Sequence, residues 1–71
     1  MAKKQRKVIT VRADEVMAGD RIVVVEGRIR KFFPVCEIQQ RGTRVWVTYR
    51  GVNGFVTLPY DDDEAVRVRD I

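Results

Sequence analysis

The run RIVVVE at positions 21–26, closed by Gly27, is the stretch that decides the fold. Its four consecutive β-branched residues are stiff at χ1 and fit a pleated surface better than a helix. Because no polar residue alternates within the run, both faces of this strand are predicted to be covered. The whole apolar set has the same bias, with 13 Val and 5 Ile against a single leucine, Leu58. The composition therefore predicts an all-β protein.

Shorter apolar runs, separated by Gly, Pro and Asp, divide the rest of the 71-residue chain into five or six strands. The other strands are expected at 8–11, 28–40, 43–50, 55–58 and 65–69, with a helical turn within 13–20. Pro34 should interrupt one strand and Pro59 should end another, because proline cannot donate to a ladder. A chain this short holds one domain, and closing its sheet into a small barrel hides the edges. We expect a flexible basic arm at 1–7 and a single barrel at 8–71.

A resemblance adds to this picture. The segment VMAGDRIVV at 16–24, followed by Glu26 and Gly27, resembles the opening strand of Src-homology-3-like small barrels, including KOW-type modules. In those modules a Gly-Asp turn launches a Val-rich strand that ends at another glycine. The hairpin at 51–58 and the last strand at 66–68 match such barrels in order and length. The resemblance covers residues 8–70 and implies a five- to six-stranded Src-homology-3-like barrel.

Residue types that are missing or rare exclude several functions. The chain has no histidine, so imidazole catalysis and His-based metal sites are excluded. Its one cysteine, Cys36, stands in an apolar strand, where a buried and inert thiol suited to a reducing cytoplasm is expected. No apolar run approaches the roughly 18 residues that cross a bilayer. We therefore expect no enzyme, no cofactor and no membrane association, and a cytoplasmic location.

The acidic turn Asp61-Asp62-Asp63-Glu64 is the one place where oxygen ligands for a divalent cation gather. It lacks the spacing and the glycine of a calcium loop, so a solvated turn is expected and no metal site is predicted. An alternative is that this turn pairs with the basic arm and weakens phosphate binding.

The positive charge is concentrated in one part of the chain, and this indicates an anionic partner. Residues 1–50 carry 12 Lys/Arg and 5 Asp/Glu, whereas residues 51–71 carry 2 and 5, for a formal net charge of +4. A basic arm on a basic body is typical of nucleic-acid binding, either DNA or RNA.

Two stretches mix positive charge with aromatic side chains, as stacking and phosphate contacts require. The alternation at 43–50 places Arg44, Trp46, Thr48 and Arg50 on one side, and a second basic cluster follows Gly27. Within that cluster, Phe32 and Phe33 must face opposite ways, so that one is buried and the other is partly exposed. The predicted nucleic-acid contacts are Lys3, Lys4, Arg6, Lys7, Arg28, Arg30, Lys31, Arg44, Trp46 and Arg50.

Two alternatives to nucleic-acid binding remain at this point. Trp and Arg are also the favoured residues of protein interfaces, so the Trp46 face could dock a protein partner or a second copy of the chain. A structural role of Trp46, covering a neighbouring strand, is the other. The Arg, Val, Asp and Gly content fits a small phage or plasmid protein of a high-G+C bacterium.

Overall fold

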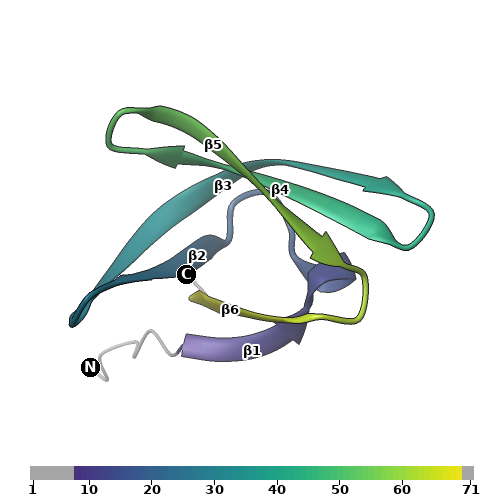
Figure 1. Ribbon diagram of the computed structural model, residues 1–71, viewed down its shortest axis with the longest axis horizontal. Helices are drawn as coiled ribbons and strands as arrows, with labels where there is room; N and C mark the ends of the chain where they lie inside the picture. Colours follow the sequence, from purple (N-terminus) through teal and green to yellow (C-terminus); the bar gives the residue numbers. More distant parts are fainter. Residues whose placement is uncertain (1–7, 70–71) are drawn as a thin grey trace, which may run out of the picture.

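The computed structural model describes residues 8–69 and consists almost entirely of strands (Figure 1). In chain order the elements are β1 (Val8–Arg12), the 3₁₀ turn η1 (Ala13–Glu15), β2 (Arg21–Glu26), β3 (Ile29–Arg41), β4 (Arg44–Gly51), β5 (Gly54–Asp61) and β6 (Ala65–Arg69). They form one antiparallel sheet in the order β1-β6-β2-β3-β4-β5. The all-β prediction is therefore confirmed.

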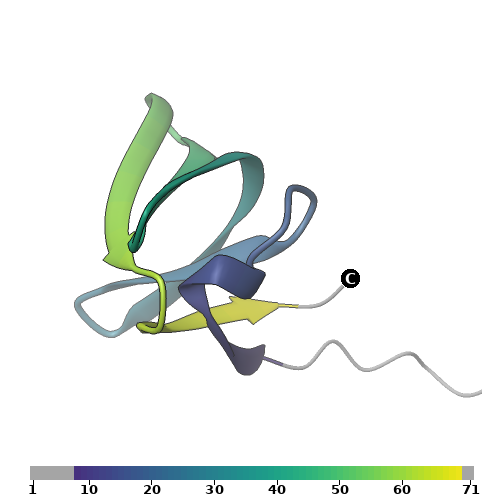
Figure 2. The same cartoon turned by 90° about the vertical axis from the view of Figure 1, so that its right-hand side faces the viewer.

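The sheet curls into two facing layers, and the long strand β3 belongs to both (Figure 2). The first half of β3 pairs with β2, and the second half pairs with β4. The register shifts between Val35 and Glu37, so that Cys36 occupies a β-bulge. A bulge bends its strand and increases the local twist. This bulge therefore lets one strand serve two layers.

The core lies between the layers and consists of β-branched residues, one tyrosine and Ala13 of η1. Val45, Val47 and Tyr49 of β4 are buried, whereas Arg44 and Arg50 are exposed, as the alternation predicts. Ile22 of β2 and Val68 of β6 are paired across the ladder and are both almost fully buried. Each buried position fixes the face of its neighbours, because successive side chains of a strand point to opposite faces.

The edge strands β1 and β5 are not joined by a ladder within residues 8–69. Beyond the last ladder pair of β1 and β6, the N–H of Ala13 donates to the carbonyl of Glu64 and the N–H of Asp14 to that of Asp62. These two bonds tie the turn after β1 to the turn between β5 and β6. The two edges of the sheet, β1 and β5, stay unpaired with each other in the described part of the chain.

The free edge of β5 is partly blocked. The N–H of Asp61 donates to the side chain of Glu64 at 3.2 Å rather than to β4. Alternate residues of a strand direct their N–H groups to the same edge, so the nitrogen of Pro59 also faces outward. Since proline has no N–H, this half of the edge offers no free backbone donor at either position.

Several sequence expectations need correction. Pro34 does not interrupt β3, because it stands opposite Arg21 within the ladder and the irregularity falls at Cys36. Pro59 does not end β5, because its nitrogen lies on the free edge and the strand continues to Asp61. Cys36 is exposed rather than buried, since the bulge turns it outward. The strand at 21–26 is not covered on both faces either, because Val25 is exposed near the hairpin tip.

The helical turn expected within 13–20 is limited to the three residues of η1. The arm at 1–7 lies outside the described residues, as do the last two positions of the predicted barrel domain. In the described part of the chain, no helix is long and apolar enough to span a bilayer. Membership of the Src-homology-3-like family stays a prediction.

Candidate nucleic-acid interface

The first candidate surface, here called the β4 face, is the outward side of β4 and its neighbours. It carries the predicted residues Arg44, Trp46 and Arg50, together with Thr48, whose hydroxyl is 2.9 Å from that of Thr57. Trp46 is only half-buried and stands between Gln39 of β3 and Pro59 of β5 in the ladder. The indole is thus neither buried in the core nor fully exposed.

The charge of the β4 face is nearly balanced. Its outward strand positions, in the register of β3, β4 and β5, hold three arginines and two carboxylates, namely Arg41, Arg44, Arg50, Glu37 and Asp61. Asp61 stands opposite Arg44, and the two side chains are 3.8 Å apart. A polyanion at this face would have to approach both carboxylates.

The second predicted cluster, after Gly27, is divided by the sheet. Arg28 lies in the turn between β2 and β3, and the next residues alternate between the two faces. Arg30 points outward, whereas Lys31 points to the inner side, where its ammonium lies 3.4 Å from the carboxylate of Glu26. Phe33 points inward and stacks on Tyr49, while Phe32 points outward. The opposite facing of the two phenylalanines is confirmed, but both are half-buried.

A second outward surface, which the sequence analysis missed, is made by β1, β6, β2 and the first half of β3. Because Ile22 and Val68 are buried partners, their neighbours Arg21 and Arg69 point outward together and stand opposite each other. The same alternation places Arg67 on this side of β6 and Arg12 on this side of β1. We call this surface the arginine face; its arginines are Arg12, Arg21, Arg30, Arg67 and Arg69.

No carboxylate occupies an outward strand position of the arginine face within residues 8–69. The twelve outward positions are Val8, Thr10, Arg12, Arg21, Val23, Val25, Arg30, Phe32, Pro34, Ala65, Arg67 and Arg69. Arg12 forms an ion pair with Asp14 of η1 at 3.1 Å. The other four arginines form no ion pair among the described residues. This surface is thus the most uniformly positive part of the sheet.

Arg69 is held in place by packing rather than by a carboxylate. Its guanidinium carbon lies 4.4 Å from the ring centroid of Phe32, across β2. A guanidinium at this distance over an aromatic face is stabilised by the ring quadrupole. Its Nε is buried and has no hydrogen-bond partner in the described part of the protein. The ring therefore orients a charged group whose hydrogen-bonding capacity is not fully used.

The direct opposition of Arg21 and Arg69 has an energetic consequence. Like charges at directly opposite positions of two strands destabilise the sheet. An anion placed between them would remove this repulsion, and planar guanidinium groups match phosphate oxygens in pairs. The arrangement suits a phosphate ligand better than it suits the stability of the sheet.

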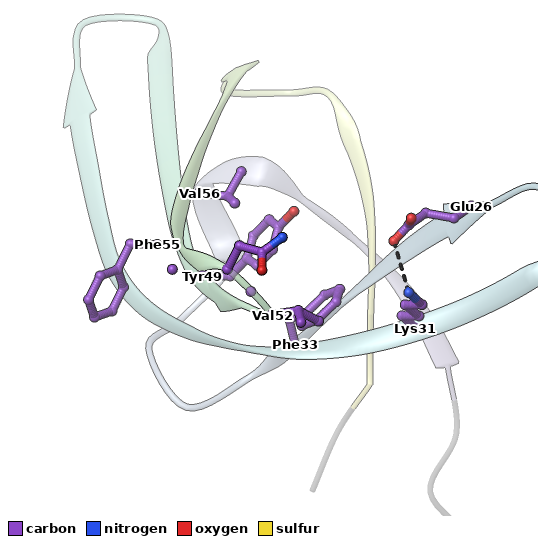
Figure 3. A pocket seen from close by; sticks show the side chains of 10 residues that line it. Glu26, Lys31, Phe33, Tyr49, Val52, Phe55 and Val56 are labelled. Carbon is purple, nitrogen blue, oxygen red and sulfur yellow. Dashed lines mark ion pairs between the residues drawn. The ribbon is translucent and has the colours of Figure 1, made fainter.

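The inner side of the sheet contains a groove with both apolar and polar lining, which is shown in Figure 3. It has a volume of about 370 Å³ and lies between the tip of the β2–β3 hairpin and that of the β4–β5 hairpin. The groove is lined by Phe33, Tyr49 and Val56, with the pair of Glu26 and Lys31 on one wall. We call it the hairpin groove.

The structure thus separates the predicted contacts instead of gathering them. Arg44, Trp46 and Arg50 share the β4 face, Arg30 belongs to the arginine face, and Lys31 lies on the inner side. The predicted contacts Lys3, Lys4, Arg6 and Lys7 lie outside the described residues. Arg67 and Arg69 could have been found from the alternation of the last strand, in which two valines point to the core. Arg21 gave no such signal, because its place depends on the pairing of β2 with β6.

Comparisons with protein families, with curated proteins and with solved structures find no match to this chain. The residues of the sheet faces are therefore the basis for assigning a function.

Proposed function

We propose that this protein is a non-catalytic nucleic-acid-binding module that holds phosphate groups on the arginine face. The observation that carries the proposal is the set of five outward arginines on four adjacent strands with no carboxylate among the outward positions. Phosphate contacts supply most of the affinity of nonspecific binding and need no base reading. A rigid sheet that presents charge in this way fits such contacts.

The place at which the chain enters the sheet adds to this proposal. Val8, the first residue of β1, stands opposite Arg69 in the ladder. The four basic residues within 1–7 directly precede it in the sequence. These basic residues are therefore close in sequence to the strand residue that stands opposite Arg69.

A reducing compartment such as the cytoplasm is part of this proposal, because Cys36 is an exposed, free thiol. The second candidate function is a protein interaction or self-association. Its support has moved from Trp46, which is half-buried, to the two hairpin tips. Five of the seven exposed large hydrophobic residues of the described chain lie there, namely Val25, Ile29, Val52, Phe55 and Val56.

The test compares two double variants of equal net charge. Arg21→Gln with Arg67→Gln removes two charges from the arginine face, and Arg44→Gln with Arg50→Gln removes two from the β4 face. Binding to a fluorescently labelled 20-nucleotide strand and to the corresponding duplex is measured by anisotropy from about 50 to 300 mM salt. If both arginines contact phosphates, the first variant lowers the log–log salt slope by about 1.4 to 1.8.

We expect the arginine-face variant to weaken binding by about tenfold or more at low salt, and the β4-face variant by about threefold or less. Equal losses in the two variants would assign the binding to net charge and not to this surface. No salt-dependent binding of the unaltered protein to DNA or RNA would remove the proposal. In that case a measured mass above that of one chain would favour the second candidate function.

A further inference from the structure

The hairpin groove has an aromatic floor. The rings of Phe33 and Tyr49 stack with their centroids 5.1 Å apart and their planes inclined by 24°. Figure 3 shows Val56 beside Tyr49. The volume of about 370 Å³ lies within the range of sites that hold small planar ligands. The groove therefore offers apolar and aromatic contact to one flat group.

Polar groups stand at the wall of this groove. The ammonium of Lys31 and the carboxylate of Glu26 are 3.4 Å apart and both are partly exposed. Asn53, in the turn after β4, adds an amide to the lining. Together these side chains offer donors and acceptors within reach of a bound group. The edge of a nucleobase carries both kinds of partner.

The charge at the mouth of the groove selects among occupants. Both hairpin tips lie at the same end of the molecule (Figures 1 and 2). Arg30 and Arg50 point to the outward side of the sheet, whereas Arg28 in the turn between β2 and β3 and Lys31 on the wall leave positive charge beside the groove. A second copy seated here would bring these like charges close to their counterparts. An occupant that joins an aromatic body to negative charge fits both the floor and the rim.

The groove and the arginine face lie on opposite sides of the β2–β3 hairpin, because Arg30 and its neighbour Lys31 on β3 point to its two sides. A strand whose phosphates lie along β6 and β2 reaches Arg30 at the tip of the hairpin. Beyond that tip lies the groove. A base in a duplex is paired and stacked and cannot enter, whereas a base in a single strand can turn inward.

We propose that the hairpin groove receives one unpaired base of a nucleic-acid strand bound on the arginine face, so that the protein prefers single strands to duplexes. This inference rests on the proposed function. Phe33 supplies the stacking surface within the groove, and Glu26, Lys31 and Asn53 supply hydrogen bonds to the base edge. The phosphates on either side of that base are held by Arg28 and Arg30 of the β2–β3 hairpin.

The test follows backbone amide signals of the complete, ¹⁵N-labelled chain during titration with a ten-nucleotide oligo-dT strand and with a ten-base-pair duplex. Gly51 and Gly54 lie at the groove, and Gly42 lies in the turn between β3 and β4 at the other end of the molecule (Figure 1). We expect the single strand to shift the signals of Gly51 and Gly54 saturably, and the duplex to leave them in place. The signal of Gly42 is the internal control. The single strand should bind at least about fivefold more tightly than the duplex.

Two variants address the groove itself. Val56→Met lengthens a side chain that points into the groove, and Phe33→Leu removes part of its aromatic floor. Each should reduce the single-strand preference to less than about twofold and leave duplex affinity unchanged. Ile9→Met, at an exposed β-branched residue of β1 outside the groove, is the matched control and should keep the preference. The amide titration uses the unaltered protein, so it tests base binding in the groove even if a groove variant fails to fold.

Each contrary outcome has a separate meaning. Equal affinity for single strand and duplex, with shifts confined to the arginine face, would overturn this inference and leave the proposed function intact. An unchanged preference in Val56→Met would also overturn it. If Gly51 and Gly54 shift with protein concentration alone and the mass doubles, a second copy covers the groove. The absence of binding to either probe would remove both proposals.

Discussion

The arginine face and the β4 face are made by the same sheet and carry the same kind of charged residue, yet they differ in how that charge is compensated. On the β4 face, cross-strand pairing places Asp61 opposite Arg44. On the arginine face, pairing places Arg21 opposite Arg69, and an aromatic ring holds the second guanidinium. The register between strands, more than the number of arginines in a strand, therefore determines how far the charge of each surface is compensated.

Charge reversal at one position of each face should give the largest contrast. Arg67→Glu places a carboxylate on the arginine face, so we expect nucleic-acid affinity at about 50 mM salt to fall by tenfold or more. Arg50→Glu makes the same change in net charge on the β4 face and should cost about threefold or less. Anisotropy titrations of both variants measure this. A larger loss in Arg50→Glu would reverse the roles assigned to the two faces.

Removing the aromatic support of Arg69 should have a smaller effect. Phe32→Leu keeps an apolar side chain beneath the guanidinium but removes the ring, a contact worth about 0.5–1 kcal/mol. We expect affinity to fall by about two- to fivefold with little change in the salt slope, because no charge is lost. The same titration checks both quantities. A fall of a whole unit in the slope would show that Arg69 had left the surface.

The two faces should also respond oppositely when one arginine is neutralised and stability is measured. Arg21→Gln removes the repulsion with Arg69 and should raise the free energy of unfolding by about 0.2–1 kcal/mol, although it weakens nucleic-acid binding. Arg44→Gln loses an exposed pair with Asp61 and should change stability by less than about 0.5 kcal/mol. Urea denaturation of both variants provides the values. A destabilised Arg21→Gln would show that the opposed arginines are already neutralised in the free protein.

Tyr60, on the inner side of β5, should make the stability of the protein depend on pH in the alkaline range. Burial, followed by the charges of Glu64 and Tyr49, raises the pKa of Tyr60 above its ordinary value of 10.0. The folded state therefore holds this proton more tightly than the unfolded state, and the stability that it contributes is present below pH 10 and lost as pH rises further. Tyr60→Phe should flatten this loss, because phenylalanine has no proton to release. Thermal unfolding between about pH 8 and 11 measures it, and an unchanged slope would contradict the assignment.

Local pattern predicted most of the fold, because β-branched runs and glycine turns act over a few residues. The alternation of β4 and the hairpin at Gly51 and Gly54 needed nothing more. The effects of the prolines could not be predicted, since a proline is tolerated wherever its nitrogen faces away from the neighbouring strand, and that depends on sheet order. The exposure of Cys36 depends on a bulge that only the pairing of β3 with two partners explains.

The candidate site was less predictable than the fold, because it depends on contacts between distant parts of the chain. The outward position of Arg44, Trp46 and Arg50 follows from the sequence. Asp61, which stands opposite Arg44, was expected in a turn instead. The arginine face requires β6, at the end of the chain, to pair with both β1 and β2. No spacing within a single strand encodes that arrangement.

The half-blocked edge of β5 has a consequence for behaviour at high concentration. An exposed strand edge is a template on which further chains can polymerise into aggregates. Pro59 and the Glu64 cap on the N–H of Asp61 leave only the beginning of β5 able to accept another strand. Pairing over so few residues is too weak to nucleate a fibre, so this edge should resist aggregation through strand pairing. The hairpin tip beside the edge stays accessible to ligands.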